Sequence, residues 1–588
     1  MSSSLDILTE SLKTKNEDEF ENFNFMKEAF GDNAPLMIKK GVYPYEFVSD
    51  ESKFLIEGLP NINSFHSQLR GESINNEQYT YAKLVYETMN CKNFGDYHDL
   101  YLKCDVLLLT DIMQNFRKTS LTRLKLDPCN YLTTPSLSWD AMLNMTKVRL
   151  GLIHDEETRL IFENNKRGGI VQAGGKRLIH ANNKYMKNYN PNEKSTFIQY
   201  VDMNNQYGKG MIDYLPYELI GKVEKNLDEI LKHSREDEIG FFVECDIECP
   251  NELHKKFRDY PLCPITRAVG LEELSEYQKG VLKLNKTKHN TKTRKLILDL
   301  HKKEKYLVHY RYLQGIVKLG YVCSKIHNVI AFKQTQWLKP YIDMNTKSRQ
   351  EKGISSFQKD FFKLLNNAIY GKTNENVLNR NNFELVKNTK LAIKKMSKEN
   401  FKCGTMINDL YFIESQKQSV KYDRPNYIGN AILDLSKLYM FEFHHNYMKQ
   451  KYGDKCELVY TDTDSFVYLV ETDDLFQDCF DNRELFDLTD VIIDKFKDGK
   501  NSKVIGMFKD ETNFKPIVSF CALAPKSYSF ITDDGINKKT CKGVSKLVLK
   551  KEISNEDYEI LVAHRVYLIS PDDVVHIIAR RSRLGPTP

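Results

Sequence analysis

Cysteine patterns that would indicate a zinc site or a disulfide framework are missing from this sequence. Its 12 cysteines are scattered, and none forms a C-x-x-C pair. The closest two, Cys245 and Cys249, have no histidine or cysteine partners at zinc-like spacing. We therefore expect free thiols in a reducing compartment.

Long apolar segments are missing as well. No N-terminal stretch resembles a signal peptide, and no run approaches the roughly 18 apolar residues that a membrane span needs. We expect an intracellular protein without a membrane partner, and the composition favours neither nucleus nor cytoplasm.

A large excess of positive charge is also absent. The chain has 86 Lys and Arg against 80 Asp and Glu, a net charge of +6, so a surface for nucleic acid must come from local clustering. One cluster lies between Lys283 and Lys305, where nine basic residues face two acidic ones, Asp299 and Glu304. This cluster indicates either a path for phosphates or a solvated lysine-rich face.

Internal repeats and long Gly-, Pro- or Ser-rich linkers are absent, so domain boundaries must be inferred from motif order. A hydrophobic content of 41% with 28% charged residues is typical of a chain that folds. At 588 residues it exceeds one hydrophobic core, and we expect about four units.

Hydrophobic periodicity, β-branched content and turn residues predict the local structure around the motifs. The expected elements are helices over 80–120 and 356–371, strands over 197–203 and 240–249, a hairpin over 457–470 and a Gly-rich stretch over 166–177. The second helix is expected to stop at its glycine.

Two aspartates of the expected hairpin stand at i and i+2. Asp462 and Asp464 in YTDTDS would share a face of the strand or turn. Asp202 lies at the end of the strand over 197–203. Short carboxylate stems at strand ends suit Mg²⁺, which demands tight octahedral oxygen geometry. Two such ions are what phosphoryl transfer uses at its attacking and leaving oxygens.

A D-x-D triplet is a weak signal alone, because a chain of this length contains about one or two by chance. Three motifs in a fixed order make the signal specific. They are DMNNQYG from Asp202, KLLNNAIYGK from Lys363 to Lys372, and YTDTDS from Tyr460 to Ser465.

These three segments resemble motifs A, B and C of the family B DNA polymerases. The resemblance implies that Asp202 and Asp464 bind two Mg²⁺ ions, for which Mn²⁺ can substitute, with Asp462 beside them. It also implies a DNA template and primer as partners, deoxynucleoside triphosphates as substrates, and template-directed addition to a primer 3′ hydroxyl.

The resemblance assigns nucleotide-binding side chains too. Tyr207 stands where the family packs a tyrosine under the incoming sugar, and its ring can exclude the 2′-hydroxyl of RNA. The residues that match the fingers motif K-x3-N-x2-Y-G are Lys363, Asn367, Tyr370 and Gly371. A lysine on that helix face would offset the negative charge on the leaving pyrophosphate.

Two motifs are expected to contact DNA. Lys526 and Tyr528 in PKSYSF match the K-x-Y motif that contacts the primer strand. Arg167, Gly168 and Gly169 stand in the place of the template-binding Y-x-G-G motif, whose tyrosine is missing here. The arginine can still contact phosphate, and the glycines allow close backbone approach.

Motif A departs from the family pattern. The family usually has S-L-Y-P where this chain has Asn205, Gln206, Tyr207 and Gly208. The departure predicts an altered nucleotide pocket that keeps the aspartate and the tyrosine.

The resemblance covers most of residues 35–545 and favours the organellar, viral and mobile-element branch, including large self-synthesising DNA transposons. It is carried further by YPYEF (43–47), YLKCDVLLL (101–109) and VHYRYLQGIVKLG (308–320). Many members of this branch start synthesis on a terminal protein. The insertions that serve it fit here, because Lys363 lies 161 positions after Asp202 and Asp462 lies 91 after Gly371. Protein and nucleic-acid priming both stay open.

An incomplete exonuclease motif set precedes the palm. Tyr101 and Asp105 match the third exonuclease motif, in which tyrosine orients water and aspartate binds metal. The family takes further ligands from an upstream D-x-E motif, and no D-x-E triplet lies between Met1 and Tyr101. We expect a truncated, vestigial exonuclease region without proofreading activity, and an incomplete gene model would look the same.

The expected fold class is α+β, a right-hand polymerase with palm, fingers and thumb behind a truncated exonuclease-like region. The expected domains are an exonuclease-like domain (1–150), a template-binding linker (151–195), a first palm segment with a terminal-protein-type insertion (196–345), fingers (346–380), a second insertion (381–425), a second palm segment (426–545) and a thumb remnant (546–588).

Two other functions compete with this interpretation. One is a decayed mobile-element remnant that binds nucleic acid without catalysis, which a primer-extension assay with Mg²⁺ would distinguish. The other, a reverse transcriptase, is disfavoured because it would carry Y-x-D-D in place of residues 460–464.

Overall fold

The computed structural model describes residues 4–14, 19–69, 71–274, 279–280, 282–283, 286, 288–289, 292–351 and 353–563. The chain forms two compact units, Met1–Lys147 with Leu338–Lys372 and Val148–Trp337 with Thr373–Pro588. Helices and antiparallel sheets both contribute, which confirms the α+β class. Of the expected thumb remnant, residues 564–588 lie outside the described residues. Every helix of the described ranges is too short or too polar to span a membrane.

The first unit is helical. Its helices are α1 (Leu5–Leu12), α2 (Asn24–Phe30), α3 (Ala34–Met37), α4 (Asn76–Thr88), α5 (Phe94–Leu124), α6 (Thr134–Thr146), α13 (Lys339–Gln350) and α14 (Ser356–Thr373). The single helix expected over 80–120 is wrong, because the chain breaks into α4 and α5. Asn90 adopts φ 52°, and the Asn93 side chain caps α5 by accepting from the backbone NH of Asp96 at 2.9 Å.

Helix α14 is longer than expected. It runs through Gly371 to Thr373, so the glycine does not end it. A glycine ends a helix by adopting positive φ, and Gly371 is not among the positive-φ glycines of the described residues. The buried Asn366 accepts from Asn345 Nδ2 at 2.9 Å and thereby ties α14 to α13.

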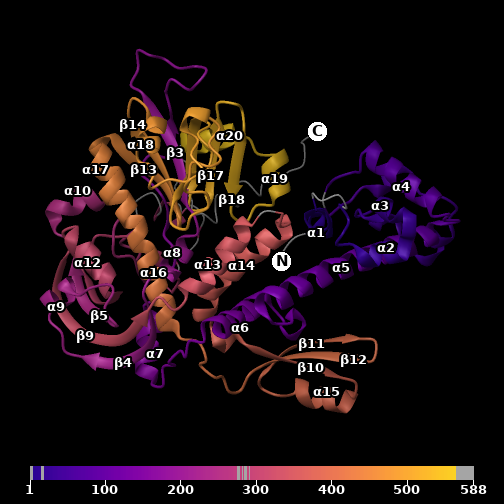
Figure 1. Cartoon of the computed structure of the whole chain (residues 1–588), viewed down its shortest axis with the longest axis horizontal. Coiled ribbons are helices and arrows are strands. Elements are labelled where there is room, and N and C mark those ends of the chain that lie inside the picture. The colour runs from indigo at the N-terminus through magenta and orange to yellow at the C-terminus, as the bar shows by residue number, and fades with distance from the viewer. Residues whose placement is uncertain are drawn as a thin grey trace. The chain divides into compact units, whose positions relative to one another are not determined.

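The second unit is built around a five-stranded antiparallel sheet, here called the palm sheet (Figure 1). In spatial order its strands are β1 (Val171–Ala173), β13 (Cys456–Asp462), β14 (Ser465–Glu471), β3 (Thr196–Met203) and β15 (Phe508–Asp510). The strand expected over 197–203 is confirmed as β3, and the hairpin expected over 457–470 is confirmed as β13 and β14.

Other sheets belong to the same unit. Their strands are β2 (Leu178–His180), β16 (Ile517–Ala524), β17 (Ser527–Thr532) and β18 (Asn537–Cys541); β4 (Leu215–Val223), β5 (Ile239–Glu248), β8 (Lys303–His309) and β9 (Val322–Thr335); β6 (Ile265–Ala268) and β7 (Arg294–Ile297); and β10 (Asn381–Val386), β11 (Phe401–Ile407) and β12 (Leu410–Gln416). The strand expected over 240–249 is confirmed as β5. The β16–β17 hairpin shares a hydrophobic core with the palm sheet, in which Tyr200, Tyr460 and Phe520 are buried.

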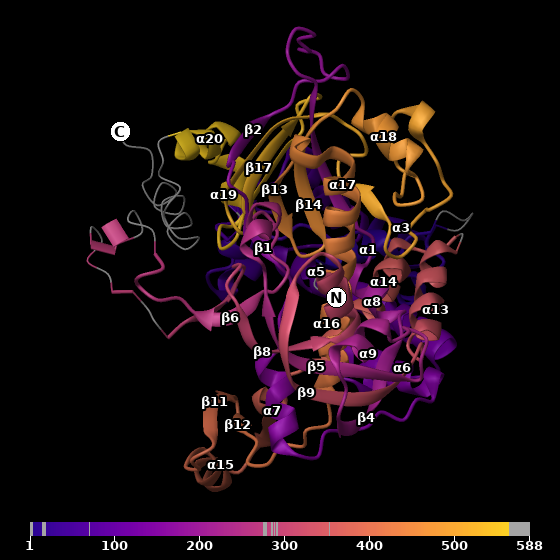
Figure 2. The ribbon, with the colours of Figure 1, turned by 90° about the vertical axis from the view of Figure 1, so that its left-hand side faces the viewer.

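Helices cover these sheets (Figure 2). They are α7 (Glu156–Asn164), α8 (Gln206–Met211), α9 (Leu227–Lys232), α10 (His254–Phe257), α12 (Tyr310–Lys318), α15 (Thr389–Met396), α16 (Asn426–Phe441), α17 (Lys449–Tyr452), α18 (Leu475–Asp481), α19 (Lys546–Lys551) and α20 (Asn555–Ala563). Helix α16 is buried along almost its whole length and contacts α8. A π-helical turn, Glu442–Met448, joins α16 to α17.

A buried carboxylate, Asp510, ends the last strand of the palm sheet. Asp510 Oδ1 accepts from Thr512 N at 2.9 Å, Thr512 Oγ1 at 2.7 Å and Phe514 N at 3.0 Å. Burial nevertheless raises the pKa of Asp510 to about 6. The protonated form is therefore favoured in the folded protein, and the stability that this form contributes is lost as the pH rises through about 6.

We expect Asp510→Asn to be more stable than the parent above pH 6, because asparagine keeps the acceptor oxygen without the buried charge. A shift of this size corresponds to about 2 to 3 kcal/mol, and the advantage should shrink as the pH falls toward 4. Urea unfolding of both proteins at several pH values measures the difference.

Asp487 is the matched control with the opposite sign. It is also buried, and burial alone would raise its pKa. Bonds from Thr489, Lys503 and Asn204 outweigh burial and hold the pKa of Asp487 below its ordinary value. Asp487→Asn should therefore destabilise the protein at neutral pH. If the free energies of unfolding of Asp510→Asn and the parent varied in parallel with pH, the raised pKa of Asp510 would be contradicted.

Candidate active site

The palm sheet brings the three predicted aspartates to neighbouring strand ends. In the ladder, Ser465 at the start of β14 is the Cα partner of Asp462 on β13 and of Asp202 on β3. Two carboxylates thus flank one serine across three adjacent strands, although they lie far apart in the sequence. Asp464 occupies the turn between β13 and β14.

The turn that carries Asp464 is held by backbone hydrogen bonds. Thr463 adopts φ 61°, which a β-branched residue adopts only under constraint from its surroundings. Its NH donates to Ile170 O at 2.7 Å, and Met203 N donates to Asp464 O at 2.8 Å. The turn is therefore fixed both to β3 and to the segment before β1.

Gly169 lies directly against this turn. A Cβ added to Gly169 would lie 2.4 Å from the side chain of Thr463, whereas one added to Gly168 would meet nothing within 4 Å. The two glycines of the predicted template motif thus differ in their surroundings. The lack of a side chain at Gly169 lets its backbone approach the turn between Asp462 and Asp464.

Charge at the site is only partly balanced. Lys526 Nζ lies 2.9 Å from both carboxylate oxygens of Asp462. Burial raises the pKa of Asp464 by more than a backbone hydrogen bond lowers it, and the negative charge of Asp462 raises the pKa further against the positive charge of Lys526. Across the described ranges no ion pair to Asp464 is formed. A cation would relieve this uncompensated charge.

The donor set fits a hard divalent ion, because Asp202, Asp462 and Asp464 offer only carboxylate oxygens. Within the described ranges, no three acidic, histidine or cysteine side chains are grouped closely enough to hold a metal. Metal binding would therefore have to draw these carboxylates together and compete with Lys526 for Asp462.

The altered motif A connects helix α8 to the same turn. Asn205 adopts φ 52° and caps α8 by accepting from Gly208 N at 3.1 Å. Gln206 is buried, and its Nε2 donates to Thr463 O at 3.0 Å. Sequence reasoning missed Gln206 as a site residue, and its place in the departure from S-L-Y-P was the signal. Tyr207 is half-buried on α8.

Lys526 is exposed, whereas Tyr528, two residues later, is buried. Lys526 has φ 61° and leads into β17, and its NH donates to Tyr460 Oη at 2.8 Å. Tyr528 is buried, with its hydroxyl 3.0 Å from that of Tyr200. In this structure Tyr528 supports the sheet beneath Lys526 through its contact with Tyr200.

Arg167 is also buried, with 4% exposure. Its Nη2 donates to Asn165 Oδ1 at 2.8 Å and to Leu307 O at 2.6 Å, and its guanidinium lies 3.6 Å from the ring centroid of Tyr306. The phosphate contact expected from the sequence is not available to this side chain here. The arginine packs against Tyr306 instead because the cation gains from the ring face.

The basic cluster between 283 and 305 is only partly on the surface. Lys303 is 3% exposed and pairs with Asp299. Residues 284, 285, 287, 290 and 291 lie outside the described residues. A phosphate path along the exposed members, such as Arg294 and Lys295 on β7, stays a prediction.

The first unit carries the predicted fingers residues on α14. Lys363, Asn367 and Gly371 are exposed at intervals of four residues, so they share one face of the helix. Tyr370 is half-buried. The opposite face is buried, with Phe362 and Leu365 at 1% and 0% exposure.

The predicted exonuclease residues contact a lysine in the first unit. Lys40 Nζ forms an ion pair with Asp105 and donates to Tyr101 Oη at 2.8 Å. Tyr101 also lies 2.7 Å from Tyr45 Oη. Burial and the bond to Tyr45 raise the pKa of Tyr101. The ammonium group of Lys40 thus pairs with Asp105, the residue that the resemblance gives as a metal ligand.

We expect no 3′–5′ exonuclease activity, because Lys40 forms an ion pair with Asp105, the aspartate that the resemblance gives as a metal ligand. The measurement offers a primer with a mismatched 3′ end, Mg²⁺ and no nucleotide. Removal of the terminal base by the parent, lost in Asp105→Ala, would contradict this prediction.

One protein family and several solved structures resemble this chain. The family model described as DNA polymerase type B, organellar and viral, matches residues 21–450. A search of curated proteins gave no match. Among solved structures, phi29 DNA polymerase in an orthorhombic crystal form is similar at 15% identity and TM-score 0.47, over 86% of this chain and 72% of that one. Its complex with primer-template DNA and incoming nucleotides is similar at 15% identity and TM-score 0.47, over 88% and 74%.

Proposed function

The chain belongs to the organellar and viral type B DNA polymerases, and we propose that it extends a primer by two-metal phosphoryl transfer at Asp202, Asp462 and Asp464. The family fixes the activity as that of a DNA-directed DNA polymerase. The observation that supports the finer proposal is the strand register, in which Ser465 pairs with both Asp202 and Asp462.

Asp202 and Asp464 would hold the ions, with Asp462 beside them. Two Mg²⁺ ions, once bound, would favour ionisation of the primer 3′ hydroxyl and offset charge on the leaving pyrophosphate. The protein contributes position: Gln206 and Gly169 fix the turn of Asp464. Lys526 orients Asp462 through its two 2.9 Å contacts until a cation replaces it.

Lys363 and Asn367 on α14 would serve the incoming nucleotide. An exposed ammonium group is suited to the triphosphate, whose charge increases on the leaving group during transfer. Tyr370 and Gly371 complete the fingers motif K-x3-N-x2-Y-G and are proposed to bind the nucleotide with them.

The partners we propose are a DNA template, a DNA primer and deoxynucleoside triphosphates, in the replication of viral or mobile-element DNA. Phi29 DNA polymerase has been solved in complex with primer-template DNA and incoming nucleotides, which shows such partners for that protein. A terminal protein is a further candidate partner. Its test supplies template and labelled nucleotide with either a DNA primer or a candidate terminal protein, and label joined to the protein would support protein priming.

Primer extension tests the proposed function directly. A labelled primer on a longer template, with four deoxynucleotides and Mg²⁺, should be extended to the template end. Absence of extension with both Mg²⁺ and Mn²⁺, together with retained DNA binding, would favour a decayed nucleic-acid-binding remnant.

We expect Tyr207→Ala to admit ribonucleotides, since the ring is the group proposed to block the 2′-hydroxyl. Loss of a steric block of about 2 to 4 kcal/mol would lower sugar discrimination by roughly 30-fold to 10³-fold. Single-nucleotide insertion of deoxy- and ribonucleotides gives the ratio of kcat/KM. Tyr207→Phe keeps the ring and is the control, and equal discrimination in the alanine and phenylalanine variants would refute the gate.

A further inference from the structure

A small basic module lies outside the catalytic strands in the second unit. It consists of β10, β11, β12 and α15, and we call residues 381–419 the basic module. Its helix packs on one face of the sheet through Val386, Ala392 and Ile413, which are buried together. Five lysines lie between positions 387 and 398 without an acidic residue among them. This cluster was not recognised from the sequence.

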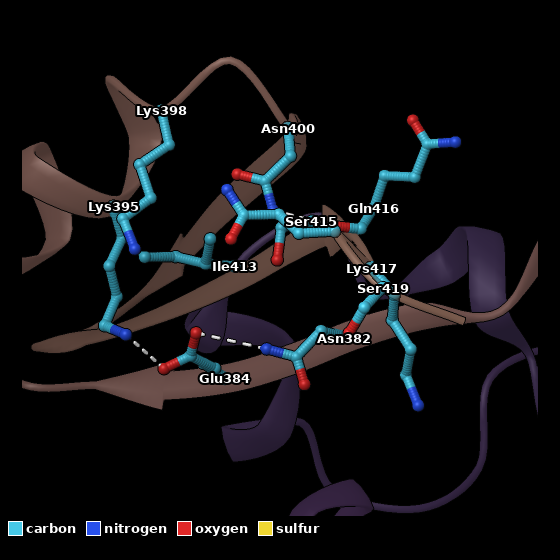
Figure 3. Close-up of a pocket in the computed structure, with 11 residues that line it drawn as sticks. Asn382, Glu384, Lys395, Lys398, Asn400, Ile413, Ser415, Gln416, Lys417 and Ser419 are labelled. Carbon is cyan, nitrogen blue, oxygen red and sulfur yellow. Dashed lines mark hydrogen bonds and ion pairs between the residues drawn. The ribbon is translucent and has the colours of Figure 1, made fainter. Parts of the chain in front are cut away.

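A pocket of about 370 Å³ opens between the helix and the sheet of the basic module (Figure 3). Lys395 and Lys398 line it from the α15 side, Asn382 and Glu384 from β10, and Lys417 from the segment after β12. Ile413 is the only aliphatic residue in a lining otherwise made of lysine, amide, hydroxyl and one carboxylate side chains.

The charge of the pocket is positive after internal pairing. Glu384 pairs with Lys395 and accepts from Asn382 Nδ2 at 3.2 Å (Figure 3). The pocket has no other carboxylate. Within the described ranges, Lys398 and Lys417 form no ion pair. Two ammonium groups are thus uncommitted in one polar cavity.

This lining selects for an oxyanion. Pockets for drug-sized molecules are lined mainly by apolar and aromatic side chains, and this one is not. A metal cation would be repelled by the two ammonium groups, whereas phosphate oxygens accept from ammonium and amide donors together. Lys390 and Lys394, four residues apart on α15, extend the positive surface beyond the pocket.

We propose that this pocket binds phosphate groups, with Lys398 and Lys417 as the principal contacts. The phosphates come either from the backbone of a DNA strand or from a free triphosphate. The extension of positive charge along α15 favours the strand, because a triphosphate would need only the pocket. The proposal does not rest on catalysis by the palm aspartates.

Amine-labelling of the full chain locates the contact. The protein is treated with an acetylating reagent in EDTA, alone and with oligo-dT of thirty nucleotides or with tripolyphosphate, and modified lysines are quantified by mass spectrometry. We expect Lys398 and Lys417 to be protected severalfold, whereas Lys402 is the internal control because it pairs with Glu414 outside the pocket lining. Protection by oligo-dT alone identifies a strand, and protection by both probes identifies the shared phosphate chemistry.

A charge-matched pair of variants tests the energetics. The pocket variant is Lys398→Gln with Lys417→Gln, and the control is Lys402→Gln with Lys333→Gln, which also removes two positive charges. The salt slope of oligo-dT binding should fall by about 1.4 in the pocket variant, at about 0.7 per phosphate contact on a single strand, and stay near the parent value in the control.

Two outcomes would overturn the proposal. One is unchanged acetylation of Lys398 and Lys417 with both probes. The other is an equal loss of affinity and slope in the pocket and control variants, which would show a general charge effect. Both measurements are made without metal or synthesis, so they fail or succeed independently of the proposed polymerase activity.

Discussion

Asp464→Asn is expected to abolish DNA synthesis. The substitution keeps the shape of the side chain and the backbone bond from Met203 N to residue 464, but it removes a negative charge from the proposed metal site. Loss of a metal ligand should cost about 4 kcal/mol or more of transition-state stabilisation, which is roughly 10³-fold in rate. Single-turnover primer extension at saturating DNA measures the effect.

DNA binding should survive this substitution, because phosphate contacts come from Lys and Arg side chains. Asp228→Asn, at an exposed position of α9, is the control and should extend primers at the parent rate. Synthesis by Asp464→Asn within tenfold of the parent would remove Asp464 from the proposed mechanism.

Gly169→Ala should be nearly as damaging, although Gly169 holds no ligand. Its new Cβ would lie 2.4 Å from the side chain of Thr463, so the turn carrying Asp464 must move. A displacement of about 1 Å at a catalytic group can lower the rate about 10²-fold. Gly169 is not a positive-φ glycine, so alanine adds no backbone strain of its own.

Gly168→Ala is the matched control, because a Cβ there meets nothing within 4 Å. The double variant Gly169→Ala with Thr463→Gly should recover much of the rate, since it removes the clashing side chain and glycine tolerates the positive φ of Thr463. Extension by Gly169→Ala at the rate of Gly168→Ala would show that the contact is unimportant.

The sequence predicted the three central strands of the palm sheet because their signals are local. Alternation and β-branched content identified β3, and the polar turn of YTDTDS identified the β13–β14 hairpin. Motif order then indicated that Asp202 belongs with Asp462, and the register places them on the two strands that flank Ser465 of β14. The family resemblance is confirmed over residues 21–450, a range that includes the first two motifs but ends before YTDTDS.

Long-range packing decided what the sequence did not predict. Arg167 looks like a surface cation in KRGG, but Leu307 and Tyr306 bury it. Gln206 looks only like a departure from motif A, but its side-chain amide donates to Thr463 O in the turn between β13 and β14. Neither partner can be inferred from spacing, because each lies more than a hundred residues away in the chain.

The strand order of the palm sheet has a consequence for how the protein is made. β3 is paired on both sides by strands that lie later in the chain, β14 from Ser465 and β15 from Phe508. During synthesis at about 5 to 20 residues per second, the first partner of Asp202 emerges roughly 13 to 50 seconds after it. Both edges of an apolar strand are unpaired for that interval. A nascent chain paused before Ser465 should therefore bind holdase chaperones and aggregate in their absence, whereas a chain released beyond Asp510 should not.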